Sequence, residues 1–314
     1  MKKGLFIDIS VVVLTYNAKW SEIKKTLLSI LYQIECNFEI IVSDDGSNYN
    51  FFREISELFE NFNFHNYKLL NHPENVGTVN NLTDALSKCS STIVKDIGQG
   101  DILYDSLVLK RFIEEMKNSK SDITFGKAIC YKDGVNPIVL KRMYYNRRMF
   151  EKNSINYLLL DDLPHGASLC IKRDVFIQYC NLINNRIVYC EDLSVGLMIA
   201  DGLKVSNINT AVVYYECTKG ISSKKSEKIK KDEEAFWMML KNRFYDSKEI
   251  SYRVLKKIMY QEKILNSKGI AYAFWRAREM FCFTGLFYYK LINLLNKIFE
   301  HEDKEVNDFF YKCI

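Results

Sequence analysis

The stretch EIIVSDDGS, residues 39–47, places two carboxyl groups at the end of a short apolar segment. Residues 40–42 are β-branched, and the run is too short for a helix, which is typical of a strand buried on both faces. Asp44 and Asp45 follow at its carboxyl end, just before a Gly-Ser turn. Ligands of open α/β sheets bind at that edge. The pattern indicates a ligand site, although an ordinary Asp-Gly turn has the same sequence.

A second acidic pair, Glu191 and Asp192, lies between an apolar run, residues 187–189, and the helical pattern of residues 193–200. This order places both acids at a helix N-terminus. One interpretation is capping, because Asp is favoured there and its charge suits the helix dipole. The other interpretation rests on a family resemblance given below.

Alternating strands and helices precede residue 105. We expect strands over residues 9–14, 40–42, 68–70 and 93–94, with helices between them, the first of which begins near Ser21. Such an alternation predicts a parallel sheet with right-handed crossovers. The polar ends of the strands, including residues 15–17 and 98–101, therefore gather at one edge of the sheet.

The composition is that of a globular protein: 314 residues, 48% hydrophobic and 26% charged. Nine cysteines without a CxxC pair favour reduced thiols over disulfides or a zinc cluster. We identify neither a signal peptide nor a run of about eighteen apolar residues, so we expect a cytoplasmic protein. From Lys219 onwards Lys and Arg exceed Asp and Glu by seven, which leaves −2 for the preceding chain. We expect no nucleic-acid partner.

Seven blocks together resemble the inverting glycosyltransferases of family two, which have the GT-A fold. They are VVVLTYN (11–17), SILYQ (29–33), EIIVSDDGS (39–47), NVGTVNN (75–81), GQGD (98–101), GASLCIKRDVF (166–176) and ED (191–192). The resemblance implies an α/β fold with a Rossmann-like, mostly parallel sheet flanked by helices. It implies a catalytic domain over 1–220, with a nucleotide-sugar half at 1–105 and an acceptor half at 106–220. Residues 221–314 would form a helical C-terminal region.

The resemblance also implies a donor site. The residues that would bind the nucleotide sugar are Thr15, Tyr16, Asn17, Asp44, Asp45, Gly77, Asn81, Gln99, Gly100 and Asp101. Asp44 would accept a hydrogen bond from the base. A carboxylate only accepts hydrogen bonds, so it selects a base edge with an N–H group, as in uracil. A structural role for one of the two aspartates, such as capping the turn, remains an alternative.

The metal motif of the family reads Asp-x-Asp-Asp, and Gly98, Gln99, Gly100 and Asp101 occupy those positions here. Asp101 alone would then hold Mn²⁺ or Mg²⁺ against the phosphates of the donor. Such ions bind through one or two carboxylates together with phosphate oxygens and water. The alternative is a glycine-rich turn in a protein that has lost metal binding.

In the family, the position of Asp192 is the catalytic base and that of Glu191 orients it or contacts the acceptor. The resemblance thus implies transfer from a UDP-sugar to a glycan or lipid-linked glycan of a bacterial surface polysaccharide. A catalytically silent nucleotide-sugar-binding or scaffolding subunit is the alternative, since two motif acids are missing. A nicotinamide-dependent enzyme is excluded at the first strand–helix turn, where TYNAKW replaces GxGxxG.

Other segments give weaker indications. Asp133-Gly134 predicts a hairpin turn, and the basic, Tyr-rich residues 141–150 either line the acceptor side or form a solvated helix face. His165 either reaches the site or is structural. Cys217 stands near a position where the family commonly has histidine, and Lys219 or Lys224 could contact phosphate.

Residues 271–299 combine Trp, Phe, Tyr and Leu with scattered Arg and Lys. The charges disfavour a membrane span. A helix of this composition can lie on an anionic membrane surface, which would place the protein peripherally on the inner face of the cell membrane. Packing on the catalytic core, or a homo-oligomer interface, explains the aromatic residues equally well.

Overall fold

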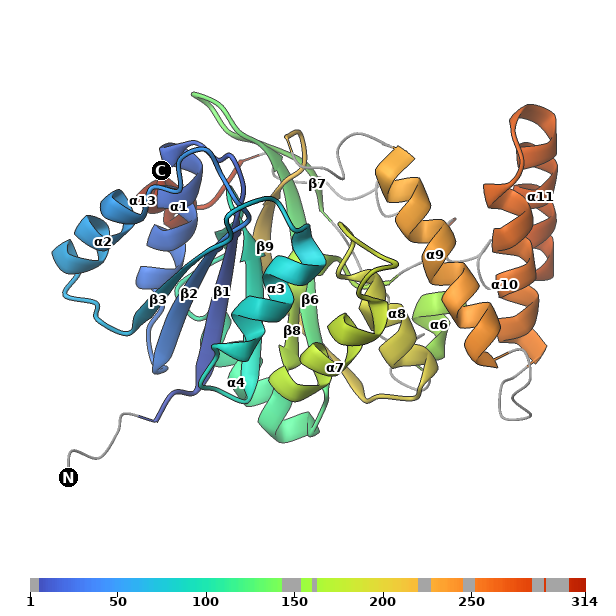
Figure 1. Cartoon of the computed structure of the whole chain (residues 1–314), viewed down its shortest axis with the longest axis horizontal. Helices are drawn as coiled ribbons and strands as arrows, with labels where there is room; N and C mark the ends of the chain where they lie inside the picture. The colour runs from blue at the N-terminus through green and yellow to red at the C-terminus, as the bar shows by residue number, and fades with distance from the viewer. Residues whose placement is uncertain are drawn as a thin grey trace.

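The computed structural model describes residues 6–142, 154–159, 163–219, 227–244, 252–283, 291 and 305–314. A mixed sheet runs through its centre, with helices on both faces (Figure 1). The strands are β1 Ile9–Thr15, β2 Phe38–Asp44, β3 Tyr67–Asn71, β4 Ile93–Gly98, β5 Ile102–Leu103, β6 Ile123–Lys132, β7 Ile138–Arg142, β8 Leu169–Lys172 and β9 Val205–Glu216. Their order is β3-β2-β1-β4-β8-β6-β9-β5, and β7 pairs with β6.

The four strand–helix units predicted before residue 105 are confirmed. Strands β3, β2, β1 and β4 are parallel neighbours, with Thr15 opposite Asp44 and Leu14 opposite Gly98. Their connecting helices are α1 Trp20–Leu31, α2 Phe52–Asn61 and α3 Thr78–Ser87. The register brings the polar strand ends to one edge of the sheet. The first helix begins before Ser21, at Trp20, because the Lys19 N–H donates to the Glu22 carboxylate at 3.1 Å.

The second half of the sheet departs from the parallel pattern. Strand β8 runs antiparallel to its neighbours β4 and β6, while β9 is parallel to β6. The predicted hairpin at Asp133-Gly134 is confirmed, because it joins the antiparallel strands β6 and β7. The expected GT-A architecture, a largely parallel sheet with helices on both sides, is therefore present.

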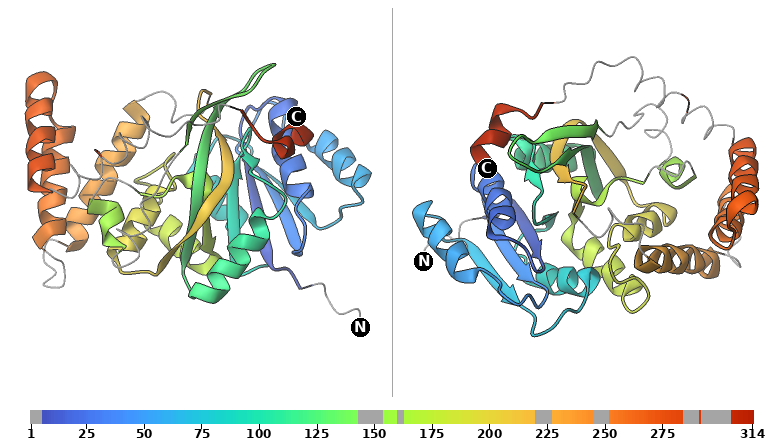
Figure 2. Two further views of the ribbon diagram at one scale, coloured as in Figure 1. Left: turned by 180° about the vertical axis from the view of Figure 1, so that it is seen from behind. Right: turned by 90° about the horizontal axis from the view of Figure 1, so that it is seen from above.

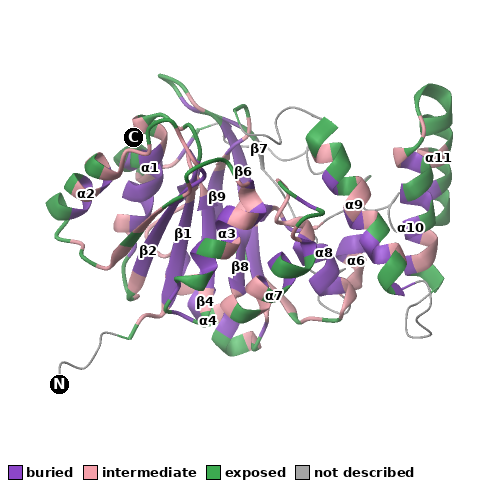
Figure 3. Cartoon of the chain, viewed as in Figure 1, coloured by how far each residue is buried: buried purple, intermediate pink, exposed green. Residues whose placement is uncertain are grey.

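Two hydrophobic clusters cover the two faces of this sheet, which is buried along most of its length (Figure 3). Alternate residues of β1 supply both: Val12 belongs to one cluster, and Val11 and Val13 to the other. The first cluster contains the helices α3, α6 Ile155–Leu159, α7 Arg173–Ile183 and α8 Leu193–Ala200. The second contains α1, α2 and α4 Val108–Ser119.

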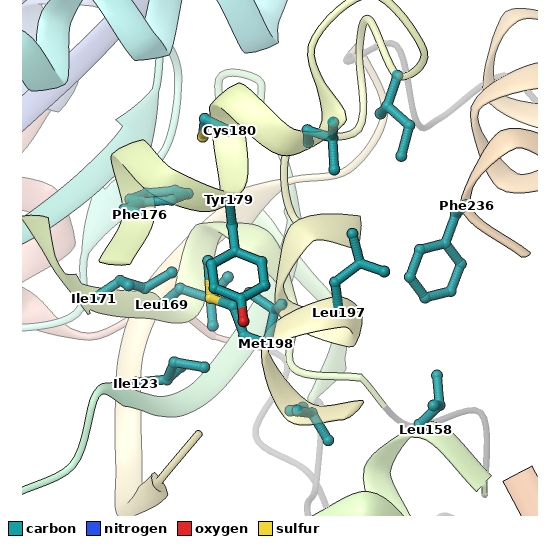
Figure 4. Close-up of a cluster of buried hydrophobic side chains, with 14 of the residues drawn as sticks. Ile123, Leu158, Leu169, Ile171, Phe176, Tyr179, Cys180, Leu197, Met198 and Phe236 are labelled. Carbon is teal, nitrogen blue, oxygen red and sulfur yellow. The ribbon is translucent and has the colours of Figure 1, made fainter. Parts of the chain in front are cut away.

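The first cluster extends into the C-terminal region (Figure 4). Helix α9, Glu227–Phe244, places Phe236 against α8, where a Cβ on Gly196 would lie 2.4 Å from the Phe236 ring. Substitution of Gly196 would therefore separate the two helices. Helix α9 is thus packed directly on the helices that cover the sheet.

The remaining C-terminal helices lie at opposite ends of the molecule (Figures 1 and 2). Helix α10, Tyr252–Leu265, packs on α9, and α11, Gly269–Cys282, packs on α10, where a fully buried Lys257–Glu279 ion pair of 2.6 Å joins α10 to α11. Helix α13, Asp308–Cys313, returns to α1 on the other side, where Phe310 packs against Tyr131 and Tyr214.

Within the described residues, no helix combines the length and the apolar character that crossing a bilayer requires. All nine cysteines are free, as predicted.

Candidate active site

A cavity of about 770 Å³ opens at the edge where the parallel strands β1 and β4 end. Ten of the twelve residues predicted for the site line it: Thr15, Tyr16, Asn17, Asp45, Asn81, Gln99, Gly100, Asp101, Glu191 and Asp192. Asp44 and Gly77 do not line the cavity. Residues separated by up to 177 positions in the chain therefore meet in one cavity, where the strand order placed residues 15–17, 45 and 99–101 and the family resemblance placed 191–192.

The tips of β1 and β4 are tied together across the cavity rim. The side-chain amide of Gln99 accepts from the Tyr16 N–H at 2.7 Å and donates to the Tyr16 carbonyl at 3.0 Å. On the other side of the same tip, the Asn17 N–H donates to Ser47 Oγ at 2.7 Å. These bonds hold the first strand tip, the Asp-Asp turn and the turn at residues 98–101 in fixed relative positions.

Asp44 is buried and already has protein donors. Thr15 Oγ1 and Ser47 Oγ donate to its Oδ1 at 2.9 and 2.6 Å, and the Ser47 N–H donates to Oδ2 at 2.7 Å. Gly46 has φ +72°, and a Cβ there would lie 2.3 Å from the backbone of Glu74. The turn therefore requires glycine. The buried Asp44 carboxylate stabilises it through the two hydrogen bonds that Ser47 donates.

Asp45 binds the loop before α3. Its carboxylate accepts from the Val76 N–H at 2.7 Å, the Asn75 amide at 3.0 Å and the Gly77 N–H at 3.2 Å. Gly77 contributes through this backbone bond rather than to the cavity wall. Burial raises the pKa of Asp45, and the two backbone donors oppose that shift. Asp45 still lines the cavity, whereas Asp44 does not.

Side chains of α1 and β6 hold the turn at residues 98–101 through hydrogen bonds. The Gly100 N–H donates to Thr26 Oγ1 at 2.9 Å, and its carbonyl accepts from the Tyr131 hydroxyl at 2.5 Å. Gly100 has φ +91°, a conformation that glycine adopts without strain. The Glu216 N–H donates to Oδ1 of Asp101 at 2.9 Å, and burial raises the pKa of Asp101 to about 7.

A metal ion would find few protein ligands here. No group of three or more His, Cys, Asp or Glu side chains within the described residues could hold one. The carboxylate of Glu216, whose backbone N–H contacts Asp101, accepts from Thr218 and from the Lys219 N–H. Asp101 lines the cavity and Oδ2 has no hydrogen bond in the described structure, so a cation held there would need its other ligands from a bound molecule and water.

Glu191 and Asp192 lie where the sequence predicted, at the start of α8. Asp192 is the N-cap residue, yet its side chain makes no capping hydrogen bond. Burial and the neighbouring Asp96 raise the pKa of Asp192 to about 6, against the opposing effect of nearby backbone N–H groups. Burial, Asp192 and Asp96 raise the pKa of Glu191 well above its usual range. Both acids line the cavity, so the arrangement suits proton transfer more than capping.

Asp232 of α9 fixes the segment before this acidic pair. Its buried carboxylate accepts from the backbone N–H groups of Val188, Tyr189 and Cys190 at 3.1, 2.7 and 3.0 Å. Asp232 was not predicted from the sequence, because nothing distinguishes it within the charged helical stretch KIKKDEEAF. Two residues of the same helix, Ile229 and Glu233, line the cavity. The C-terminal region thus positions and encloses part of the site.

A charged network borders the cavity beside residue 216. Lys219 Nζ contacts Asp133 at 3.0 Å and Glu22 at 3.2 Å, and the buried Lys25 contacts Asp133 at 2.9 Å. Lys219 and Glu22 line the cavity. Lys219 could therefore contact a phosphate at the predicted position only if it gave up its contacts with Asp133 and Glu22. Lys224 and residues 143–150 lie outside the described residues.

His165 reaches the cavity and also has structural contacts. Its Nδ1 accepts from the Ala167 N–H at 3.3 Å, and its ring packs edge-on against Tyr215, with ring centroids 4.3 Å apart. Cys217, near the position where the family commonly has histidine, contacts the Tyr131 carbonyl through its thiol at 3.4 Å and does not line the cavity.

Solved structures with similar folds include S. aureus TarS. The chain is 19% identical to TarS 1–349, with a TM-score of 0.53 over 82% of this chain and 71% of that one. Against TarS 1–349 in complex with UDP-GlcNAc, the identity is 18% and the TM-score 0.55, over 88% and 73% of the two chains. Against a longer TarS structure, the identity is 18% and the TM-score 0.54, and the alignment spans 43% of that protein. These likenesses are likenesses of fold.

No curated protein sequence matches this chain. A sequence profile described as "Glycosyl transferase family 2" matches residues 10–179, which is more than half of its length. The matched range includes β1, β2, β4 and the turn at residues 98–101, so it contains most of the cavity wall. The chain therefore belongs to glycosyl transferase family 2 and is a glycosyltransferase.

Proposed function

We propose that this glycosyltransferase moves a sugar from a UDP-sugar to a glycan or lipid-linked glycan acceptor, with inversion at the anomeric carbon. The observation that carries the proposal is the convergence in one cavity of Asp192, whose pKa is raised to about 6, with the predicted nucleotide residues of β1, β2 and β4. TarS, which has a similar fold, is described in complex with UDP-GlcNAc, and this supports a UDP-sugar donor.

The donor would lie along the strand ends, with its base near residues 15–17 and Asp45. Asp45 is better placed than Asp44 to accept from an N–H of uracil, because Asp45 lines the cavity. Its carboxylate already accepts three hydrogen bonds, and a carboxylate offers about four acceptor positions. Gln99, Gly100 and Asn81 complete the donor side of the wall.

Asp192 would act as the general base. In a single displacement, the acceptor hydroxyl gives its proton to Asp192 while its oxygen bonds to the anomeric carbon of the sugar. The bond from that carbon to the phosphate oxygen breaks, and UDP leaves with the electron pair. A base with a pKa near 6 is ionised at neutral pH and still accepts a proton readily. Glu191 would hold or orient the acceptor through its neutral carboxyl group.

We further propose a Mn²⁺ or Mg²⁺ requirement, with Asp101 as the protein ligand. When bound, such an ion would neutralise charge on the diphosphate. The raised pKa of Asp101, about 7, and its single free oxygen argue for weak binding of the cation in the absence of donor. Lys219 is a further cation of the cavity wall.

The C-terminal helices carry the features of a membrane-surface contact. Ile270 of α11 is 91% exposed and Phe281 is 82% exposed, while Lys256 and Lys263 of α10 and Arg278 of α11 have no carboxylate partner among the described residues. Exposed apolar side chains on helices that also carry cations without carboxylate partners favour an anionic lipid surface. A homo-oligomer interface is the competing explanation. The division at residue 220 between catalytic domain and helical region also stays a proposal.

A panel of UDP-sugars with Mn²⁺ tests the main proposal. Isothermal titration would measure binding, and release of UDP would measure transfer or slow hydrolysis. We expect at least one donor to bind in a metal-dependent way and to be hydrolysed slowly without acceptor. Binding without any turnover, also in the presence of membrane glycolipid extract, would favour the catalytically silent nucleotide-sugar-binding or scaffolding subunit. Absence of binding to UDP itself would contradict the proposal.

A further inference from the structure

Asp96 is an acid in the cavity wall to which neither the family blocks nor the proposed mechanism gives a role. It lies on β4 opposite Val12 of β1, two residues before Gly98, and it is 5% exposed. Its Oδ1 is enclosed and has no hydrogen-bond partner among the described residues. The residue lines the cavity, and only Oδ1 is among the enclosed unpartnered atoms, which leaves Oδ2 as the carboxyl oxygen that can face that space.

An enclosed carboxyl oxygen without a donor is a poor place for negative charge. Taking an ionised carboxylate out of water without a donor costs far more free energy than burying the neutral acid. Lys95, the neighbouring cation, donates its Nζ proton to the main-chain carbonyl of Asp96 rather than to the carboxylate. The neutral acid leaves Oδ1 as a weakly polar carbonyl and places an O–H group on Oδ2. That group is a hydrogen-bond donor.

The acids around Asp96 favour the same neutral state, and Lys95 opposes it. Glu191 and Asp192 lie before α8, Lys95 is on β4 itself, and Cys170 and Cys180 belong to β8 and α7. Burial raises the pKa of Asp96, which Lys95 only partly offsets. Neighbouring acids in one cavity do not all ionise at neutral pH. The repulsion between Asp96 and Asp192 is mutual, so the ionised base Asp192 disfavours a second negative charge on Asp96.

We propose that Asp96 is a specificity-determining residue which stays protonated and donates a hydrogen bond from Oδ2 to a hydroxyl or acyl oxygen of the transferred sugar. This inference rests on the proposed function. The depth of the residue points to the sugar rather than the nucleotide: Tyr16 and Gln99 tie the rim of the cavity, whereas Asp96 precedes that turn on the strand and is electrostatically coupled to Glu191 and Asp192.

Two substitutions separate the neutral donor from an ionised acceptor. Asp96→Asn keeps the shape and a donor, so we expect its affinity for the UDP-sugar to stay within about threefold of wild type. Asp96→Leu removes the donor, and we expect it to bind the UDP-sugar roughly tenfold to a hundredfold more weakly, the usual range for a lost buried hydrogen bond. Binding of UDP alone stays unchanged in both variants, because UDP lacks the sugar.

Stability provides an independent readout. Asp96→Leu replaces a buried, unpartnered polar group by an apolar one of similar size, so we expect its melting temperature to equal or exceed that of wild type. Ser194→Ala is the matched control. Its hydroxyl is also buried and unpartnered among the described residues, but Ser194 does not line the cavity. We expect this control to bind UDP and the UDP-sugar as wild type does.

The measurements are titrations of UDP and of UDP-GlcNAc, UDP-GalNAc, UDP-glucose and UDP-galactose into each intact variant. An equal loss of sugar-dependent affinity in Asp96→Asn and Asp96→Leu would overturn the neutral-donor assignment. Wild-type affinity in Asp96→Leu would remove Asp96 from the sugar site while leaving the proposed function intact. Failure of the wild-type protein to bind UDP would contradict the proposed function and this inference together. If Asp96→Leu does not fold, Asp96→Ala takes its place with the same expectations.

Discussion

The acids around the cavity fall into two groups that differ in what already holds their oxygens. Asp44, Asp45 and Asp232 each accept three hydrogen bonds from the protein. We call these the held acids. For Glu191 and Asp192, burial outweighs the effect of nearby backbone N–H groups and raises the pKa values of both. We call these the free acids.

The difference shows that the acids with the stronger sequence motif need not be the acids that act on a substrate. The DDGS turn has the stronger sequence signal, yet much of the hydrogen-bonding capacity of Asp44 and Asp45 is used in building the turn and the loop before α3. The free acids line the cavity, and their raised pKa values suit them to exchange a proton with a substrate. Substitution of a held acid should therefore reduce stability first, and substitution of a free acid should reduce turnover first.

The largest effect is expected for the free acid Asp192. Asp192→Asn keeps the shape but cannot accept a proton, so we expect kcat to fall 10²-fold or more, with UDP-sugar binding and melting temperature retained. Steady-state kinetics and calorimetry measure these quantities. Asp174→Asn is the control, since that exposed acid lies in the first turn of α7. Turnover within about tenfold of wild type would reduce Asp192 to a helix-terminal residue.

Asp101 stands between the two groups, because Oδ1 is held by the Glu216 N–H and no bond to Oδ2 is found in the described part of the chain. We expect Asp101→Ala to abolish the dependence of UDP-sugar binding on Mn²⁺ or Mg²⁺. Titrations of UDP-sugar into the variant with and without the ion measure this dependence. If the variant kept the metal dependence of wild type, the cation would have to bind elsewhere in the cavity.

The held acid Asp232 tests the other side of the comparison. Asp232→Ala leaves three backbone N–H groups of residues 188–190 without their acceptor, which should cost about 2–4 kcal/mol of unfolding free energy. We expect kcat/KM to fall about tenfold, since the segment before Glu191 loosens. Denaturant unfolding measures the free energy, and steady-state kinetics measure kcat/KM. Glu234→Ala, on the same helix and paired only with Lys230 in the described structure, should change neither.

The free acids also predict opposite pH trends for activity and stability. Asp192 acts as a base only when ionised, so kcat/KM should fall as the pH is lowered through about 6. The raised pKa values of Asp192 and Asp101 mean that, between about pH 4 and 7, the folded state binds more protons than the unfolded state. Their contribution to stability therefore decreases as the pH rises across this window. Thermal melts of wild type and Asp101→Asn should show a weaker decrease in the variant.

The smallest effect concerns the C-terminal helices. Replacement of Ile270 and Phe281 by serine should reduce salt-sensitive co-sedimentation with anionic vesicles by several-fold, since both side chains are exposed. Val135→Ser is the control, because Val135 is 98% exposed in the β6–β7 turn, on a different part of the chain. Substitutions suit this test better than truncation, since α9 and α13 pack on the catalytic core. Equal pelleting of all three proteins would favour an oligomer interface.

The first half of the fold and most of the site could be predicted from local sequence. Strands such as residues 9–14 are continuous β-branched runs, and the alternation of strands and helices fixes which strand ends share an edge. The acids at 44–45 and 101 could therefore be placed at one edge from their positions in the chain, and the family resemblance added those at 191–192. Their residue types also limited the chemistry to hydrogen-bond acceptance, cation binding and proton transfer.

Only the tertiary structure decided which of these acids remain available. Hydrogen bonds between residues about 30 to 44 positions apart, such as Asp45 to Val76 and Asp232 to Val188, have no local sequence pattern. The same holds for Asp96, which reads as one polar residue in a strand until the sheet encloses it. Burial and hydrogen bonding set the charge state of a carboxyl group, and both depend on residues that meet only in the folded chain.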